Sequence, residues 1–161
     1  MKNNNKPKED ERQKVGKQLS FALYGATSRM IRSHRSFLEP LGLTFPQFLV
    51  MVTLYEKIPR TVGEIGSELG MDNGTLTPLL KRLVSAGLVT RERDAQDDRR
   101  VLINLTANGE AMREDVLSIP AKIESACKLS NKDLADLRDT LNNLGLSPNL
   151  YSQVEDNEQG K

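Results

Sequence analysis

The sequence predicts a mainly helical fold that carries a small β-hairpin, because the spacing of its apolar residues changes along the chain. Between residues 44 and 87, apolar residues recur every three or four positions in three short segments, as they do on one face of a helix. Between residues 88 and 105 they alternate with polar residues, as they do in a β-strand. The 161 residues suffice for one domain with a buried core and tails.

A long amphipathic helix is expected first, beginning near Leu19 and ending before Pro40. His34 lies in the single gap of its apolar stripe, which consists of Leu19, Leu23, Ala26, Met30 and Phe37. Ahead of this helix, residues 1–14 are polar and charged without periodicity, which predicts a disordered basic tail. Residues 147–161 are expected to form a second, flexible tail at the other end.

Two short helices are predicted next, each with a recognisable first residue. The earlier one is capped by Thr44 and has Pro46 in its first turn. The later one is capped by Thr61 and ends at Gly70.

A third short helix is expected to be capped by Asp72 and to close at Gly87. Its apolar residues follow the helical spacing throughout and are Leu76, Leu79, Leu80, Leu83 and Val84. Because proline is favoured in the first turn of a helix, Pro78 leaves open a later start at Thr77. The register of Leu76 with the later leucines favours the earlier start.

A β-hairpin follows, with strands at 88–93 and 100–105 joined by the polar turn 94–99. Its second strand places three apolar residues on one face: Val101, Ile103 and Leu105. Helix, helix, helix and hairpin is the element order of a winged helix-turn-helix.

Further helices are expected after the hairpin. One begins at Thr106 and extends to about residue 119, and its continuation past Pro120 is left open. The last begins with a capping box at Ser130 and Asp133 and ends near Leu144.

Composition excludes several classes of protein. The formal net charge is only +1, although residues 1–36 are basic and residues 106–161 acidic, so bulk charge predicts no binding to polyanions. One cysteine and one histidine predict no intramolecular disulfide, no metal site and no Ser-His-Asp triad, and we expect neither a cofactor nor an enzyme. No apolar run approaches the roughly 18 residues of a membrane span and no signal peptide is evident, which predicts a cytoplasmic protein without membrane contact.

The polar face of the helix that begins at Asp72 is the first candidate DNA contact. Hydroxyl groups and cations on such a face suit base edges and phosphates in a major groove. Its residues are Gly74, Pro78, Lys81 and Ser85, flanked by Thr75, Thr77 and Arg82. The alternative is a solvated helix face, on which the same residue types are common.

The hairpin turn is the second candidate. Arg99 and Arg100 follow three aspartates, Asp94, Asp97 and Asp98. An aspartate that holds one arginine outward would let it enter a narrow minor groove, where the potential is most negative. The alternative is a salt-bridged surface turn. The order of the helix and the hairpin together favours DNA binding.

Residues 71–83, 86–91, 94–100 and 105–106 resemble the MarR family of dimeric winged-helix transcription regulators. Within that family the chain is most similar to the organic hydroperoxide resistance regulators, through Phe21-Ala-Leu-Tyr24, Leu38-Glu-Pro-Leu-Gly-Leu-Thr44 and Gly74-Thr-Leu-Thr-Pro-Leu-Leu80. The resemblance covers about residues 18–145.

The resemblance implies a MarR-type domain over residues 15–146. Dimerisation helices would lie in 15–38 and 106–146, and a DNA-binding lobe in 44–105. A two-fold dimer would bind double-stranded DNA at an inverted repeat whose half-sites are about one helical turn apart. The implied function is transcription regulation, with repression favoured over activation.

The resemblance also assigns DNA contacts. It implies that five residues face the major groove: Asn73, Thr75, Thr77, Pro78 and Lys81. With Arg82, Asp97, Arg99 and Arg100 they make up the expected DNA-binding residues. Arg99 would enter the minor groove, oriented by Asp97. Asn73 replaces the serine usual at its position, so the preferred bases are expected to differ.

The sensor pocket departs from the family pattern. Ser20 occupies the position of the reactive cysteine, and a hydroxyl cannot form a sulfenic acid as a thiolate does. Tyr24 is retained, but His34 and Phe45 stand where supporting tyrosines are usual. This combination favours natural loss of peroxide sensing over an engineered replacement. A small-molecule effector would then bind between the dimer arm and the DNA lobes, or be absent.

Several alternatives stay open. Cys127 is interpreted as core packing, or as an oxidant sensor that acts alone or pairs with Cys127 of a second subunit. His34 is a satisfied core histidine, or a group that responds to pH or ligand. A winged-helix module for protein–protein contact and a thiol peroxidase are the other two functions considered.

Overall fold

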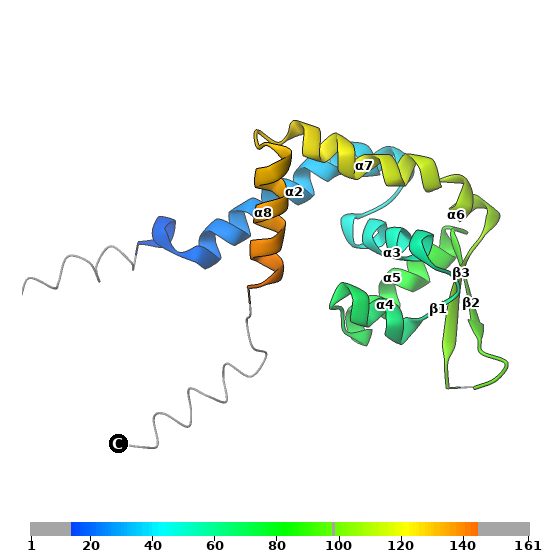
Figure 1. The fold of residues 1–161 in the computed structure, drawn as a ribbon. Helices are drawn as coiled ribbons and strands as arrows, with labels where there is room; N and C mark the ends of the chain where they lie inside the picture. Colours follow the sequence, from blue (N-terminus) through cyan, green and yellow to red (C-terminus); the bar gives the residue numbers. More distant parts are fainter. Residues whose placement is uncertain (1–13, 98, 145–161) are drawn as a thin grey trace, which may run out of the picture. The chain divides into compact units, whose positions relative to one another are not determined.

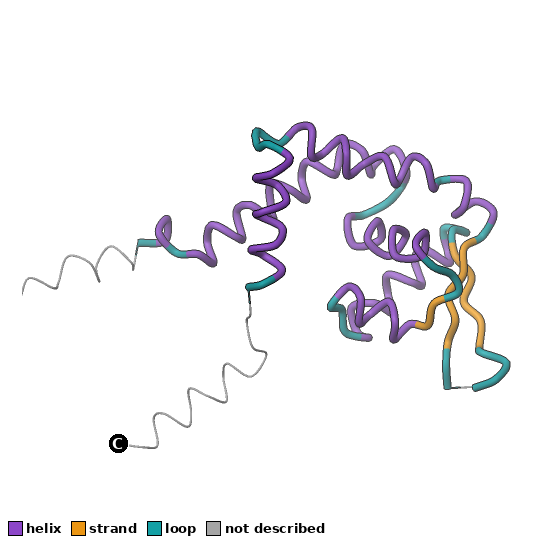
Figure 2. Tube along the Cα trace, viewed as in Figure 1, coloured by secondary structure: helices purple, strands orange, loops and turns teal. Residues whose placement is uncertain are grey.

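The computed structural model describes residues 14–97 and 99–144, and within them the mainly helical fold with a β-hairpin is confirmed (Figures 1 and 2). The helical elements are η1 Val15–Lys17, α2 Leu19–Leu38, η2 Glu39–Leu41, α3 Phe45–Glu56, α4 Val62–Leu69, α5 Asn73–Ser85, α6 Ala107–Ala111, α7 Arg113–Ala126 and α8 Asn131–Asn142. The strands are β1 Arg60–Thr61, β2 Val89–Arg93 and β3 Val101–Leu105. Asp98, the tail predicted at 147–161 and all but the last residue of the one predicted at 1–14 lie outside the described residues.

The chain divides into two compact units, Met1–Ile123 and Glu124–Lys161. The first unit contains the three short helices α3, α4 and α5 beside the three strands, and the β2–β3 hairpin projects from this cluster (Figure 1). The second unit contains the end of α7 and α8. Ser130 and Asp133 form the predicted capping box at the start of α8, and none of this helix's residues is buried.

Side-chain caps set the helix starts as the sequence predicts. Thr44 forms a capping box with Gln47, and Thr61 forms one with Glu64. Asp72 caps α5 by accepting a hydrogen bond from the Thr75 N–H at 2.7 Å, which confirms the earlier of the two possible starts. Pro78 therefore lies inside α5, where its lack of an N–H leaves no α-helical bond to the Gly74 carbonyl.

The sheet contains one strand more than the sequence predicts. Its order is β1-β3-β2, all antiparallel, and β1 joins it through the pairs Arg60 with Ile103 and Thr61 with Leu102. A two-residue strand shows no alternation of apolar and polar residues, so only its pairing with β3 reveals it.

The core of the first unit lies between α3, α5, β3 and α7. Its most buried members are Leu38, Val50, Met51, Leu54, Ile65, Leu76, Leu80, Leu83, Val89, Ile103, Val116 and Ile119. Val84 does not belong to it, because its side chain is 39% exposed, and its inclusion in the predicted apolar face was wrong.

The helix predicted from Thr106 onward is interrupted, and Met112 separates α6 from α7. The Met112 N–H donates to the Gly109 carbonyl three residues earlier, at 3.3 Å, which tightens the end of α6 and redirects the chain. Thr106 caps α6 as predicted, and α7 continues past Pro120.

A polar joint connects α3 with α6 and α7. The buried Tyr55 hydroxyl donates to the Gly109 carbonyl at 2.7 Å, and Arg113 Nη1 donates to the Tyr55 carbonyl at 2.8 Å. The Arg113 guanidinium also lies over the Tyr55 ring, 4.8 Å from its centroid. Burial raises the pKa of Tyr55 to about 12, the Glu110 carboxylate adds to this and Arg113 opposes it.

We expect Gly109→Ala to lower the free energy of unfolding by about 1–3 kcal/mol, because the new Cβ would overlap the backbone carbonyl of Leu88. Gly63→Ala is the matched control, since a Cβ in α4 meets nothing closer than the Thr61 hydroxyl at 4.0 Å. The free energy of unfolding of Gly63→Ala is expected to rise by about 0.5–1 kcal/mol, because alanine is favoured over glycine inside a helix. Urea unfolding at one protein concentration measures both, and equal stabilities would contradict the packing at Gly109.

We expect the joint at Tyr55 to weaken at high pH. Because the folded pKa of about 12 exceeds the ordinary value of 10, the unfolded chain loses its phenol proton first. The contribution of the protonated Tyr55 phenol to the free energy of unfolding is complete below pH 10 and declines as the pH rises toward 12. Urea unfolding of wild type and Tyr55→Phe below and above pH 10 measures it, and a stability difference that stays constant would refute it.

Candidate nucleic-acid interface

One face of α5 is buried and the other is exposed. Leu76, Leu80 and Leu83 are buried in the core, so the rotation of the helix about its axis is fixed. The residues that consequently reach the surface are Asn73, Gly74, Thr75, Pro78, Lys81, Arg82 and Ser85, with Thr77 half-buried. Every α5 residue proposed from the sequence to face DNA therefore has at least partial access to solvent.

The N-terminal turn of α5 carries a fixed negative group. Asp72 accepts hydrogen bonds from the backbone N–H and the hydroxyl of Thr75 and from the N–H of Gly74. These bonds hold the pKa of the Asp72 carboxyl below its ordinary value. A phosphate approaching this end of the helix would meet the Asp72 carboxylate, which already accepts from N–H groups of this turn. The cations that can offset this charge are Lys81 and Arg82, which lie on the exposed surface of the same helix.

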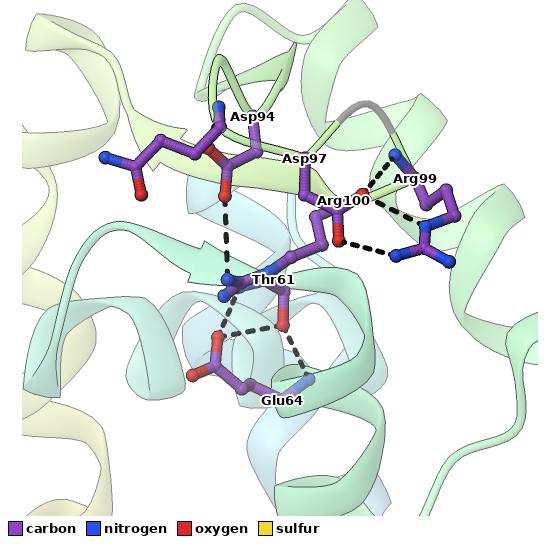
Figure 3. A network of polar contacts seen from close by, with 7 residues as sticks. Thr61, Glu64, Asp94, Asp97, Arg99 and Arg100 are labelled. Atoms are coloured by element: carbon purple, nitrogen blue, oxygen red, sulfur yellow. Dashed lines mark hydrogen bonds and ion pairs between the residues drawn. The ribbon is translucent and has the colours of Figure 1, made fainter.

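Arg99 is the most exposed group of the hairpin turn for which a contact is described, with 91% of its side chain accessible. Its backbone N–H and its Nε both donate to Asp97 Oδ1, each at 3.1 Å (Figure 3). These bonds lower the pKa of the Asp97 carboxyl. The aspartate thus directs the guanidinium outward while leaving most of it accessible.

Arg100 is held differently from its neighbour. Its Nη1 lies 3.7 Å from Asp94 Oδ2, and the Asp94 side chain is only 14% exposed. Figure 3 shows the Arg100 guanidinium between Asp94 and the Thr61–Glu64 pair, while Arg99 points away on the other side of Asp97. Two adjacent arginines therefore have different surroundings.

Sequence reasoning missed Glu64 as part of this site. The spacing of Thr61 and Glu64 marks a capping box, and the structure contains it: the Thr61 N–H donates to Glu64 Oε2 at 2.7 Å and its hydroxyl at 2.8 Å. That spacing carries no information on the distance from Glu64 to the β2–β3 hairpin, which is the wing of this fold. Pairing of β1 with β3 brings this helix start next to Arg100.

The four residues assigned to the sensor pocket fall into two groups. His34 and Phe45 lie together, with ring centroids 4.8 Å apart, and the buried His34 donates from Nδ1 to the Met30 carbonyl at 2.8 Å. Ser20 and Tyr24 lie exposed near the start of α2, with Tyr24 72% accessible. Ser20 and His34 are about 21 Å apart along the helix, so one chain does not bring them together.

A pocket of about 410 Å³ lies beside Phe45, between the second half of α2 and the start of α3. Its walls are mainly apolar, with contributions from Ile31, Leu38, Leu43 and Phe45. Arg32 and Arg35 add two guanidinium groups and Glu39 adds a carboxylate, to which Arg35 donates at 2.6 Å, so Arg32 is, of the described lining residues, the cation left to offset a ligand's charge. The combination suits an organic anion with an apolar body.

Cys127 is half-buried, which differs from the fully buried packing role expected for it. It follows α7 in the second unit, where its backbone N–H donates to the Glu124 carbonyl at 3.0 Å. Across residues 14–97 and 99–144, no group of three or more His, Cys, Asp or Glu side chains is arranged to hold a metal ion.

Among the described residues, no single helix has the length and apolar composition needed to cross a membrane. The stretches Leu19–Leu41 and Phe45–Glu56, bent by 72° at their junction, reach that length and composition only as a pair.

Three short helices, a hairpin, an outward polar face on the third helix and an exposed arginine in the hairpin turn define a winged helix-turn-helix protein. The model of the MarR family matches residues 43–101. The organic hydroperoxide resistance transcriptional regulator of Bacillus subtilis (strain 168) is 40% identical over 128 residues, which cover 80% of this chain and 87% of that protein. The chain belongs to the MarR family.

Solved structures agree with this assignment. Reduced AbfR bound to DNA, a protein of Staphylococcus epidermidis, aligns with a TM-score of 0.68 at 34% identity, over 85% of this chain and 98% of that one. The MepR–DNA complex of S. aureus aligns with a TM-score of 0.71 at 26% identity, over 78% of this chain and 94% of the other.

Truncation of the buried face of α5 tests its orientation. We expect Leu80→Ala to lower the free energy of unfolding by about 2–5 kcal/mol, because a buried leucine is replaced by a cavity. Val84→Ala, on the same helix but partly exposed, is expected to stay within about 0.5 kcal/mol of wild type. Urea unfolding compares the two variants, and similar losses would show that α5 is rotated differently.

Proposed function

We propose that this chain is a DNA-binding transcription regulator that acts as a homodimer on an inverted repeat, with repression as its mode. The observation that carries the proposal is the exposed polar face of α5 next to a hairpin turn whose Arg99 is accessible and directed by Asp97. A helix of this kind suits a major groove, and an outward arginine suits the adjacent minor groove.

The proposed DNA contacts divide into two groups. Asn73, Thr75, Thr77 and Pro78 would meet base edges through amide, hydroxyl and apolar groups. Lys81 and Arg82 would neutralise phosphates, which supplies affinity and salt dependence but little sequence preference. Arg99 would enter the minor groove, where narrow A·T-rich segments concentrate negative potential.

The dimer is supported by apolar side chains that the single chain leaves exposed. On α2 these are Leu19, Phe21, Tyr24, Met30 and Ile31, and in the second unit they include Leu129, Leu137 and Leu141. Exposed apolar groups in such number are typical of an interface. Light scattering in solution tests the dimer.

The proposed sensor does not use a thiol at the family position, because Ser20 carries a hydroxyl there. The pocket beside Phe45 supports an organic anion as effector, which would shift the dimer toward a geometry that does not fit successive grooves. We place this activity in the cytoplasm with the DNA. The relatives are named as transcriptional regulators, and we propose no enzymatic activity.

We expect Lys81→Gln and Arg99→Gln each to weaken binding to the DNA upstream of the encoding gene. Each lost cation should lower the slope of log K against log salt by about 0.9 per contact. Fluorescence anisotropy across salt measures both quantities. Lys132→Gln removes a cation of α8, away from α5 and the hairpin, and is the control: where light scattering shows an unchanged oligomeric state, it should leave binding unchanged.

The same titration with organic hydroperoxide separates the alternatives. Binding that survives the oxidant supports a site without peroxide chemistry at Ser20. Release by the oxidant that Cys127→Ser abolishes would instead make Cys127 the sensor. If the wild type binds no DNA from that region, the operator hypothesis fails there and the protein–protein module gains support.

A further inference from the structure

We propose that Arg100 is a positioning residue of the wing: it ties the hairpin turn to the start of α4 and does not itself contact DNA. The proposal rests on the DNA-binding function above. It separates the roles of Arg99 and Arg100, which the sequence places side by side as two expected DNA contacts.

The turn closes around Asp94. The Asp94 N–H donates to the Arg100 carbonyl at 2.9 Å, and the Arg100 N–H donates to the Asp97 carbonyl at 2.8 Å. Asp94 Oδ1 accepts from the Gln96 N–H at 2.9 Å, which leaves Oδ2 for the Arg100 guanidinium 3.7 Å away. Arg100 is therefore bound to the turn through its backbone and its side chain together.

The opposite side of the Arg100 guanidinium faces the helix-turn-helix. Thr61 pairs with Leu102, two residues beyond Arg100, so the first turn of α4 lies beside the base of the wing. Figure 3 shows the Glu64 carboxylate on this side. The pKa of Glu64 is lowered chiefly by the hydrogen bonds from Thr61, with Lys57 and Arg100 contributing further.

Electrostatics favour this division of roles. Arg100 lies near two carboxylates, Asp94 and Glu64, and its side chain is 53% exposed, whereas Arg99 is paired with Asp97 and is 91% exposed. Withdrawal of Arg100 into a DNA groove would leave the largely buried Asp94 carboxylate unpaired beside approaching phosphates. Insertion of Arg99 carries no such cost.

The first test compares Arg100→Gln with Arg99→Gln by fluorescence anisotropy on the upstream DNA across salt. A positioning role predicts that Arg100→Gln weakens binding several-fold while the salt slope stays at the wild-type value, and that Arg100→Lys restores much of the affinity. Arg99→Gln should lower both affinity and slope, by about 0.9 for each lost contact. A slope that falls in Arg100→Gln as it does in Arg99→Gln would overturn the proposal.

Asp94→Asn gives a second test, because the two explanations predict opposite changes in DNA affinity. If the turn acts only through its net charge, removing a carboxylate near DNA must tighten binding. If Asp94 and Arg100 position the wing together, Asp94→Asn weakens binding, and the double variant Asp94→Asn/Arg100→Gln is no weaker than the worse single variant. Tighter binding by Asp94→Asn, or losses that add in the double variant, would contradict the proposal.

Hydrogen exchange without DNA separates this proposal from the function on which it rests. Arg100→Gln should speed exchange of the Asp94 amide, which bonds across the turn, whereas Arg99→Gln should leave that amide unchanged. This pattern in a protein that binds no DNA would support the tie between wing and helix while refuting the proposed function. Unchanged exchange in Arg100→Gln would overturn the tie itself.

Discussion

The burial of the leucine face of α5 is the constraint on which the rest of the DNA-facing surface depends. Leu76, Leu80 and Leu83 insert between α3 and β3 and cannot leave without opening cavities in the core. Their burial fixes the rotation of the helix, so residues on the opposite face, such as Pro78 and Lys81, point to solvent. The polar face is thus a consequence of packing on the opposite side.

The wing depends on charge pairs whose effect is directional. Exposed aspartate–arginine pairs contribute little to the free energy of unfolding, because water and salt screen them. They can still select one rotamer of a long side chain, as Asp97 does for Arg99. Asp94 is largely buried, so its pairing with the half-exposed Arg100 is shielded from water and salt on the aspartate side only.

The elements proposed to face DNA and the position aligned by resemblance with a reactive cysteine lie in different parts of the chain. Ser20 and Tyr24 belong to the first turns of α2, whereas the polar face and the wing belong to α5 and the β2–β3 hairpin. A change of sensor chemistry at Ser20 therefore leaves the residues of α5 and the wing untouched. Membership of the MarR family is therefore compatible with the proposed departure from peroxide chemistry.

The sequence by itself determined the helix starts, because capping is a local interaction between a side chain and N–H groups two or three residues later. Thr44, Thr61, Asp72 and Ser130 each begin a helix as predicted. The change from helical to alternating spacing likewise fixed the hairpin and the face shared by residues 101, 103 and 105.

Only the tertiary structure decided the features that depend on partners distant in sequence. Strand β1 exists because β3 supplies its hydrogen bonds, and the same pairing brings Glu64 to Arg100. The break between α6 and α7 accompanies the bond from Tyr55 to the Gly109 carbonyl. Two adjacent arginines look alike in sequence, and they differ in the folded chain because backbone direction at the turn places one beside the more exposed Asp97 and the other beside the largely buried Asp94.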